Sequence, residues 1–447
     1  MHDSVTIART LMADSLGFHI IFAMLGVGLP LVILLIEHLG IRRKDPLILE
    51  HARRLSIASI ILVVAGVASG TVISLQMALV WGNLIKFGGS IMGLAFGWEG
   101  YAFMIESVFL AFYVTTWGKI KGWRHWLIGL PVALGSLGSA LAITLGNAWM
   151  QNPGMLDVVN GKVVSTNPLG ALLTKTAFFM TSHSVVGYYM ATILCVLGIY
   201  AFYVWRYRPS GNDQTAVHTI MLRLVIASFV LIAVEAALGH LQTQYLAVSQ
   251  PRKFAALETV QTTTRDAPYI VGGHFTADGK VEDGLRIPGL LSILTDWTTN
   301  TKVTGLDSFP KSDWPMLFIN LLFEIKMALV SLVAAITLVF ALLHIKKIKE
   351  RIRRWRYSKL VLLGLMITGP LTIVIVELGW MIAEFGRQPF AVNGYLRTSD
   401  AFSASQAVTN WGYLFPLSYV VLFVATGIAL RSLLKHQGKV RPSKDLL

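Results

Sequence analysis

Two glutamates stand inside a long apolar stretch of the chain, in the segment WEGYAFMIES. Glu99 and Glu106 are seven residues apart, so on a helix both lie on one face, about 10 Å apart along the axis. Ionisable groups at membrane depth are costly, usually face the interior of a helix bundle, and mark a function. Acids stacked in this way could pass protons along the helix, whereas the simpler alternative is a pair that hydrogen-bonds neighbouring helices.

Other residues with ligand or proton chemistry recur in similar apolar surroundings. They are His19, His183, Glu235, His240, Glu324, Lys326, Met327, Glu377 and Glu384. The chain has a single cysteine, Cys195, and no HExxH spacing, which argues against zinc and against an iron–sulfur cluster. Histidine, methionine and carboxylate ligands fit axial ligation of haem better.

The elements that must position these residues are membrane helices. The chain is 54% hydrophobic and 14% charged, with a mean hydropathy of +0.62, which is typical of a polytopic membrane protein. Apolar runs of about 18 or more residues are candidate spans. The sequence therefore predicts an all-α integral membrane protein, a bundle of nine transmembrane helices near residues 15–37, 55–80, 94–117, 125–148, 181–205, 219–246, 317–344, 359–384 and 411–433. The first run lacks a basic n-region and a cleavage site, so we expect it to be retained.

The distribution of lysine and arginine predicts the orientation of the bundle. With nine spans, the connections between helices alternate between the two sides of the membrane. The connections on one side, together with the C-terminal tail, carry 23 Lys and Arg residues, and those on the other side carry 13. The richer set includes IRRKD (41–45), KIKGWR (119–124) and KKIKERIRRWRYSK (346–359). Positive charge favours the cytoplasmic side, so the N-terminus is expected outside and the C-terminus in the cytoplasm. The net charge of +14 then belongs to a collar facing anionic lipid, and nucleic-acid binding is not expected.

One loop departs from the pattern of short connections. The chain is predicted to divide into transmembrane helices 1–6 (residues 1–246), an extracytoplasmic loop (247–316) and helices 7–9 (317–447), all within a single membrane domain. Loops of that length are usually functional. In the predicted topology four ligand-type residues on four helices lie toward the outer face: His19, His183, Met327 and Glu384.

Six motifs along the whole chain carry a family resemblance. They are GFHIIFA (17–23), EGYAFMIE (99–106), NAWMQNP (147–153), SHSVVGYY (182–189), QPRKFAALE (250–258) and WMIAEFGRQPF (380–390). With them the chain resembles subunit I of cytochrome bd-type quinol oxidases, in the branch with a short loop, called the Q-loop, between helices six and seven. The resemblance implies a terminal respiratory oxidase of the prokaryotic cytoplasmic membrane. Such an enzyme oxidises membrane quinol at the outer face and reduces dioxygen to water with cytoplasmic protons, generating a proton-motive force without pumping.

The resemblance also implies the roles of individual residues. His19 and Glu384 match the ligands of the two high-spin haem irons, without deciding which haem each holds. His183 and Met327 match the ligands of the low-spin haem b iron. The remaining matches are the proton-transfer acids Glu99 and Glu106, the quinol-linked pair Lys253 and Glu258, and Trp380 and Arg387 beside the haems. For Lys253 and Glu258, a surface ion pair is the alternative.

Cofactors and partners follow from the same resemblance. They are two b-type haems with haem d, or with a third b-type haem, together with subunit II and commonly a small single-span subunit. Two alternatives remain open. One is a cyanide-resistant quinol oxidase with only b-type haems. The other, of a different class, is a non-catalytic membrane cytochrome that transfers electrons or senses oxygen.

Overall fold

The computed structural model describes residues 2–164, 167–276, 278–344, 358–403, 412–437 and 446. Within them the chain forms nine helices of 24 residues or more. These are α1 (His2–Arg43), α2 (Pro46–Val80), α3 (Gly82–Thr115), α4 (Trp123–Gln151), α6 (Lys175–Tyr207), α7 (Gly211–Ser249), α10 (Ile319–Leu342), α12 (Lys359–Phe385) and α15 (Leu414–Gln437). Eight are long and apolar enough to cross a membrane, so the chain is a multi-pass, mostly helical membrane protein.

The helix outside that count of eight is α3, which carries Glu99 and Glu106. It has 34 residues and carries Lys86 in addition to its two glutamates. Gly89 breaks its helical geometry with φ 49° and ψ −124°, values that glycine adopts readily. The kink separates a short first part from the segment that runs along α4. The count of nine spans therefore stays a prediction.

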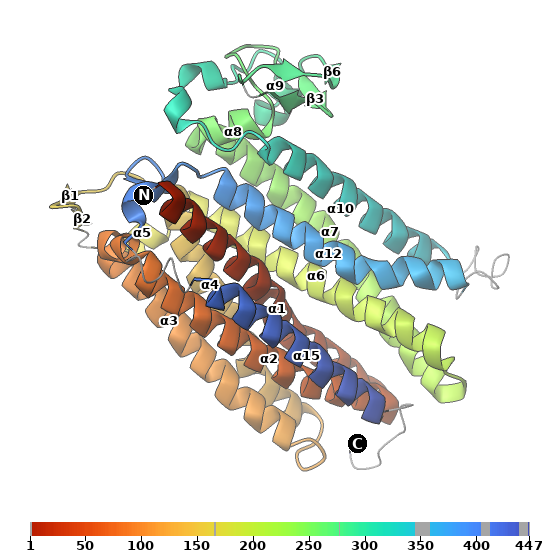
Figure 1. Ribbon diagram of the computed structural model, residues 1–447. Helices are drawn as coiled ribbons and strands as arrows, with labels where there is room; N and C mark the ends of the chain where they lie inside the picture. The colour runs from red at the N-terminus through yellow and green to blue at the C-terminus, as the bar shows by residue number, and fades with distance from the viewer. Residues whose placement is uncertain are drawn as a thin grey trace.

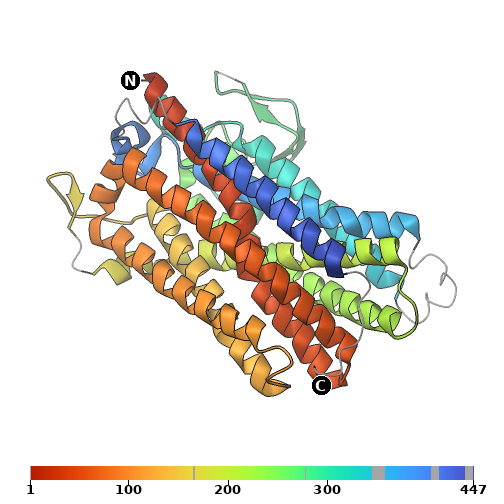
Figure 2. The same ribbon diagram turned by 60° about the horizontal axis from the view of Figure 1, so that its bottom comes forward.

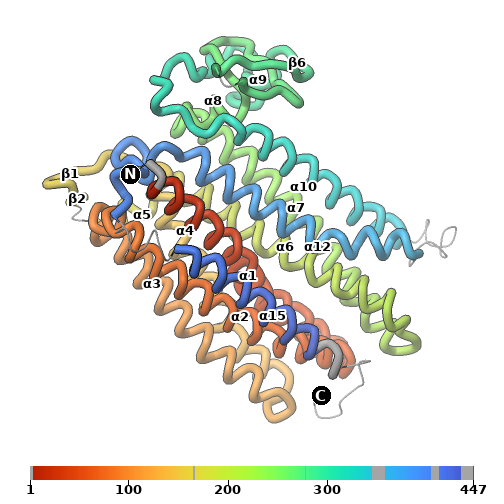
Figure 3. The backbone as a smooth tube through the Cα atoms, in the orientation of Figure 1, coloured from red at the N-terminus to blue at the C-terminus, as the bar shows by residue number. Residues whose placement is uncertain are grey.

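The long helices form one elongated bundle with two different ends (Figure 1). The loop end carries the N-terminus, the β1–β2 hairpin, α5 (Pro168–Leu172) and the long loop between α7 and α10. The turn end carries the short connections between α1 and α2, α3 and α4, and α6 and α7 (Figures 1 and 3). Viewed from a second direction, α15 runs beside α1 and α2 (Figure 2). Successive connections between the long helices thus lie at alternate ends of the bundle, as predicted. The side of the membrane that each end faces stays a prediction. Most of the basic segment 346–359, and Trp411, lie outside the described residues.

Polar residues between apolar runs begin and end the helices. At the start of α2, the Asp45 carboxylate accepts hydrogen bonds from the backbone N–H groups of Leu47 (2.9 Å) and Ile48 (3.4 Å). Pro46 occupies the first helical position, where its missing N–H costs nothing. This cap explains why the helix begins at residue 46, well before the apolar run predicted from residue 55.

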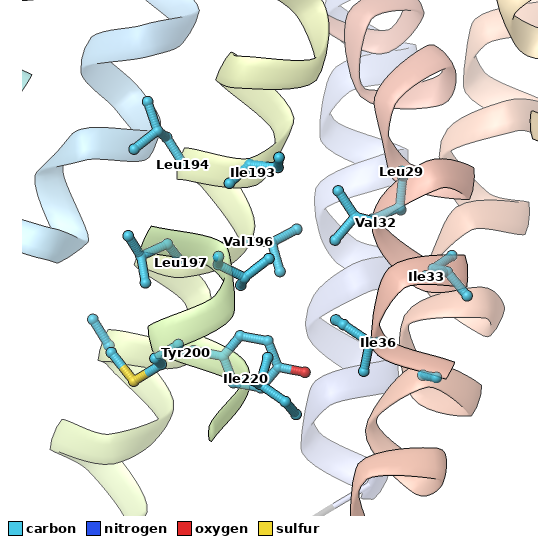
Figure 4. Packing of buried hydrophobic residues seen from close by; sticks show 14 of the residues in the cluster. Leu29, Val32, Ile33, Ile36, Ile193, Leu194, Val196, Leu197, Tyr200 and Ile220 are labelled. Atoms are coloured by element: carbon cyan, nitrogen blue, oxygen red, sulfur yellow. The ribbon is translucent and has the colours of Figure 1, made fainter. Parts of the chain in front are cut away.

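The main core joins α1 to α6 and α7 (Figure 4). Leu29, Val32, Ile33 and Ile36 form one apolar face of α1 and are at most 4% exposed. They pack near a matching stripe of α6, labelled from Ile193 to Tyr200 (Figure 4). Such interdigitation supplies most of the attraction between helices where lipid competes for apolar contacts.

Glycine allows α3 and α4 to approach closely. A Cβ placed on Gly135 of α4 would lie 2.8 Å from the backbone nitrogen of Glu106 and 2.9 Å from the carbonyl oxygen of Ala102. Backbone atoms cannot move aside as a side chain can, so any larger residue would push the two helices apart. This contact fixes the depth of Glu106 against α4.

The long loop, residues 250–318, folds into short elements over the loop end. It contains α8 (Pro251–Leu257), α9 (Leu290–Asp296) and two 3₁₀ turns (Leu306–Ser308 and Lys311–Asp313). Antiparallel pairs join β3 (Tyr269–Val271) to β6 (Leu285–Ile287) and β4 (His274–Phe275) to β5 (Val281–Glu282). The α8 side chains Phe254, Ala255 and Ala256 are at most 2% exposed, so this helix is anchored in the bundle. Two further hairpins, β1–β2 (Val158–Val159, Lys162–Val163) and β7–β8 (Phe390–Val392, Leu396–Arg397), precede α5 and α13 (Thr398–Ala401).

Candidate functional site

The carboxylate of Glu384 lies at the end of α12 and has two polar partners. Its Oε1 atom accepts a hydrogen bond of 2.6 Å from the side-chain amide of Asn147 on α4. Its Oε2 atom is paired with the guanidinium of Arg387, which also donates to the carbonyl oxygen of Ala391. Arg387 is 7% exposed. The predicted ligand is therefore held and electrically balanced by charge-assisted hydrogen bonds.

Lys253 of α8 enters the same polar cluster. Its Nζ atom donates to the Gln151 side-chain oxygen (3.1 Å) and to the Ala383 carbonyl oxygen (3.0 Å). Gln151 also donates to the Ala383 carbonyl oxygen at 3.0 Å. Burial lowers the pKa of Lys253 to about 7, an effect that Glu384 opposes and Arg387 reinforces. The motifs NAWMQNP, QPRKFAALE and EFGRQP, distant in sequence, thus converge on one site, which we call the Glu384 cluster (Asn147, Gln151, Lys253, Glu384 and Arg387).

Glu258, at the end of α8, occupies a separate position. Lys253 and Glu258 are each 8% exposed, and no ion pair joins them within the described part of the chain, so the alternative of a surface ion pair is wrong. Burial raises the pKa of Glu258 to about 7, with a further contribution from the negative charge of Glu324. The Glu324 carboxylate in turn accepts a hydrogen bond of 2.7 Å from the backbone N–H of Gly272. This acid is therefore poised to exchange a proton near neutral pH.

His19 is oriented by a neighbouring helix. Its Nδ1 atom lies 2.8 Å from the Ser69 hydroxyl, which itself donates to the Gly66 carbonyl oxygen at 3.0 Å. Because the hydroxyl hydrogen is engaged there, Nδ1 carries the hydrogen and Nε2 keeps its lone pair. A Cβ on Gly70 would lie 3.3 Å from Cε1 of the ring. The glycine thus makes room for an imidazole whose free nitrogen can ligate iron.

His183 lies in a cluster with charged residues of two other helices. Its Nδ1 atom is 3.1 Å from a carboxylate oxygen of Glu235 on α7. Lys326 of α10 acts electrostatically on both residues. A Cβ on Gly239 would lie 3.4 Å from Cε1 of the His183 ring, so glycine again makes room for the imidazole.

Met327 follows Lys326 on α10 and is 46% exposed. Successive helical residues point about 100° apart, and Lys326 is the one whose charge acts on the His183–Glu235 pair. The assignment of Met327 as an iron ligand stays a prediction. No role was predicted for Glu235 from the sequence. Its place as an ionisable residue within an apolar run was nevertheless a signal of a functional role.

Glu99 and Glu106 lie on α3, as their spacing predicted. Glu106 is 4% exposed, and its carboxylate has no hydrogen-bonding or ionic partner among the described residues. The alternative of an interhelical hydrogen-bonding pair therefore lacks the partner it requires. Glu99 is partly exposed. A buried acid without a partner is costly unless it is protonated for part of the time, which suits proton transfer.

Trp380 lies on α12, four residues before the predicted ligand Glu384. Its indole N–H donates a hydrogen bond of 2.9 Å to the hydroxyl of Tyr188 on α6. Glu377, one turn earlier, has a buried carboxylate oxygen without a hydrogen-bond partner in the described residues. Tyr188, Asn147 and Gln151 were not predicted as site residues, although all three fall within quoted motifs. The available signal was the presence of polar residues in or beside an apolar run.

The side chains fit haem as the cofactor. His19 Nδ1 lies beside the Ser69 hydroxyl, and His183 Nδ1 lies beside the Glu235 carboxylate. A glycine lies next to each imidazole ring. Several other buried polar atoms of the described residues have no hydrogen-bond partner, namely Asn147 Oδ1, Glu235 Oε2, His240 Nε2, Glu377 Oε1 and Arg387 Nε. Buried polar atoms are normally satisfied, and a cationic guanidinium suits the carboxylates of a haem. Within the described residues, no group of three or more His, Cys, Asp and Glu could hold a metal ion.

Comparisons with known proteins identify the family of the chain. The model of the family "Cytochrome bd terminal oxidase subunit I" matches residues 7–438. The chain is 30% identical over 424 residues to a Bacillus subtilis protein described as a cytochrome bd menaquinol oxidase subunit I, covering 95% of each chain. It is 24% identical to the cytochrome bd-II ubiquinol oxidase subunit 1 of Escherichia coli, covering 99% of this chain and 98% of that one.

A solved structure agrees over nearly the whole chain. The bd oxidase from Geobacillus thermodenitrificans is similar with a TM-score of 0.89 and 32% identity, covering 97% of this chain and 99% of the matched chain. The nearly complete coverage leaves no large part of the fold unmatched. The chain belongs to the cytochrome bd terminal oxidase subunit I family.

Proposed function

We propose that this chain oxidises membrane quinol at the loop end and reduces dioxygen to water with protons taken from the turn end. The Glu384 cluster carries the proposal, because it ties the long loop directly to the segment of a predicted iron ligand. The relatives support a quinol as electron donor, one being named for menaquinol and another for ubiquinol. Their names differ, so the quinone type stays open.

The haems of this family would be held by residues from several helices. We propose His19 and Glu384 for the two high-spin irons, and His183 with Met327 for the low-spin haem b iron. Bound haem supplies electron transfer from quinol and the centre at which dioxygen is reduced. The same ligands can hold two b-type haems with haem d, or three b-type haems. Arg387 would pair with haem carboxylates, and Trp380, whose indole N–H donates to Tyr188, would lie beside the haems.

The loop end supplies groups for quinol oxidation. Quinol must release two protons as it gives up two electrons, so a base near neutral pKa is useful there. Glu258 is proposed as that base, and Lys253 as the group that links the quinol site to the Glu384 cluster. We expect quinol protons to leave at the outer face and the protons for water to enter from the cytoplasm, through Glu106 and then Glu99. This separation generates a proton-motive force without pumping.

The raised pKa of Glu258 predicts how quinol oxidation depends on pH. Because burial raises that pKa to about 7, the carboxylate is mostly protonated below this pH and becomes a base above it. The kcat/KM for quinol should therefore rise from pH 6 to pH 8. In Glu258→Gln the value should be low, and this rise should be absent. An unchanged rise in the variant would show that another group sets the profile.

Replacing Lys253 tests the link between the loop and the bundle. Lys253→Met keeps most of the side-chain volume but removes the donor to Gln151 and Ala383. Quinol-driven oxygen uptake should fall at least about tenfold, as expected for a positioned polar group, while the reduced haem spectrum is retained. Arg252→Gln, one residue earlier and half-buried, is the matched control and should keep most activity. Loss of the haem spectrum in Lys253→Met would instead indicate a structural role.

The partners are also proposals. Members of this family generally work with a second subunit, and a small single-span subunit commonly accompanies the pair. The exposed apolar side chains of the long helices must contact either lipid or such subunits. Within the prokaryotic cytoplasmic membrane, the substrates would be membrane quinol and dioxygen.

A further inference from the structure

A second buried polar cluster lies at the turn end, far from the long loop. It joins Glu37 near the end of α1, Tyr113 near the end of α3 and His125 in the first turn of α4. These residues are 1%, 2% and 1% exposed, respectively. The predicted roles of the family resemblance include none of them. A buried carboxylate and imidazole are expensive to keep within a membrane protein unless they serve a purpose.

The contacts in this cluster define a shared proton. Glu37 accepts a hydrogen bond of 2.6 Å from the Tyr113 hydroxyl, and its other oxygen lies 2.7 Å from His125 Nδ1. His125 Nε2 lies 3.0 Å from the backbone carbonyl oxygen of Tyr113, which can only accept, so Nε2 carries a hydrogen. A second hydrogen must lie between Nδ1 and the carboxylate, because two lone pairs would otherwise face each other. The pair is then either imidazolium with carboxylate or imidazole with carboxylic acid, and it holds one transferable proton.

The surroundings of the pair are apolar or already neutralised. The Trp117 ring lies 4.2 Å from the His125 ring, and its N–H donates to Ser56 Oγ at 3.0 Å. On α2, which packs along α1, Glu50 is paired with both Arg53 and Arg54. Also on α2, His51 lies 3.5 Å from Asp213 of α7. On α1 itself, His38 packs against the rings of Trp123 and Trp126. No other charge among these groups pairs with Glu37 or His125.

The position of Tyr113 links this cluster to the two glutamates of α3. Tyr113 is seven residues after Glu106, which is seven residues after Glu99, so the three lie on one helix face at steps of about 10 Å. The step from Tyr113 to Glu106 is longer than one hydrogen bond and needs bridging water. The buried hydroxyl of Ser136, next to Gly135, provides a polar group near the level of Glu106.

We propose that the Glu37–His125 pair is the proton-loading station of the path that supplies Glu106, with Tyr113 as the connecting hydroxyl. The pair lies one helical turn from the connection between α3 and α4 and can be reloaded from the predicted cytoplasmic side. In each transfer the shared proton leaves toward Glu106, and a proton from solvent replaces it, so the charge of the pair is restored. The inference rests on the proposed proton uptake from the turn end.

The test compares variants of the complete enzyme, with its partner subunit, in membranes. Quinol-driven oxygen uptake per haem is measured in H₂O and in D₂O for Glu37→Gln and His125→Gln. Both should lose at least about tenfold in turnover, within the range of a proton-transfer group, with a larger H₂O/D₂O ratio than the unaltered enzyme and a retained haem spectrum. His51→Gln is the matched control, a buried histidine of the same end, and it should leave both readouts unchanged.

Other outcomes distinguish a failure of the Glu37–His125 proposal from a failure of the proposed proton path. Normal turnover and isotope ratio in Glu37→Gln and His125→Gln would overturn the loading station, while a slow Glu106→Gln enzyme would leave the proton path itself standing. Normal turnover in all three would overturn both. If the Glu37 and His125 variants fail to assemble, Tyr113→Phe decides the matter, because it keeps the Glu37–His125 contact and removes only the connecting hydroxyl. A slowed, haem-replete Tyr113→Phe enzyme supports the proposal, and an unaltered one contradicts it.

Discussion

Replacing Glu384 by alanine should abolish oxygen uptake and remove haem from the protein. The carboxylate has two expected roles, as an iron ligand and as the counter-charge of Arg387, and alanine removes both. Breaking a buried ion pair by deleting one partner typically costs about 3–5 kcal/mol, because the remaining charge is left uncompensated. Arg387 and Lys253 would be left in that state, since both are buried beside Glu384.

The measurement is the ratio of haem to protein in purified enzyme, read with oxygen uptake on the same sample. Glu384→Gln also removes the negative charge and is a poorer iron ligand, but it keeps the side-chain volume and one oxygen that can accept the hydrogen bond of Asn147 or of Arg387. Comparing it with alanine shows how much of the loss comes from the cavity that alanine leaves. Glu377→Gln is the matched control, since Glu377 is a glutamate two turns earlier on the same helix. It should keep its haem content. A full haem complement in Glu384→Ala, or its loss in Glu377→Gln, would show that the ligand was assigned to the wrong glutamate.

Replacing Glu106 by glutamine should slow oxygen reduction without removing haem. Glutamine has nearly the same volume, so the close contact of α3 with Gly135 is preserved, but an amide cannot carry a proton. Turnover per haem should fall at least about tenfold, in keeping with the loss of one proton-transfer group. Glu99→Gln should have the same kind of effect, since each acid is a step of the proposed path.

Oxygen uptake per haem, measured with saturating quinol, checks this prediction. Gly100→Ala is a suitable control on the same helix, because a Cβ there would meet nothing within 4 Å. It should retain normal turnover and protein level. Normal oxygen uptake in both Glu99→Gln and Glu106→Gln would remove the two acids from the proton path.

The helices could be predicted from the sequence because lipid imposes long uninterrupted apolar runs. The ends of the helices were harder to predict, because caps and polar turns extend a helix beyond its apolar part. The Asp45 cap does this at the start of α2. The kink at Gly89 had no signal distinct from the other glycines of α3. The strands of the long loop have two or three residues each, too few to show an alternating pattern.

The types of residue in the site could be predicted from the sequence, but only some of their contacts could. Spacing alone placed Glu99 and Glu106 on one face, because both are on one helix. The contacts of Lys253 could not be derived in that way, since Gln151 and Ala383 are on helices more than a hundred residues away in sequence. The Glu37–His125 pair was missed for the same reason, because its members lie 88 residues apart.

Whether this chain forms a haem-containing quinol oxidase can be read from a dithionite-reduced minus oxidised spectrum of membranes containing it with its partner subunit. Oxygen uptake on added quinol is recorded on the same sample. A quinol oxidase should give haem bands together with quinol-driven uptake. A far-red band would identify haem d, whereas b-type bands alone would identify the cyanide-resistant variant. Haem bands without oxygen uptake would rule out the oxidase function and indicate a membrane cytochrome that transfers electrons or senses oxygen without reducing it.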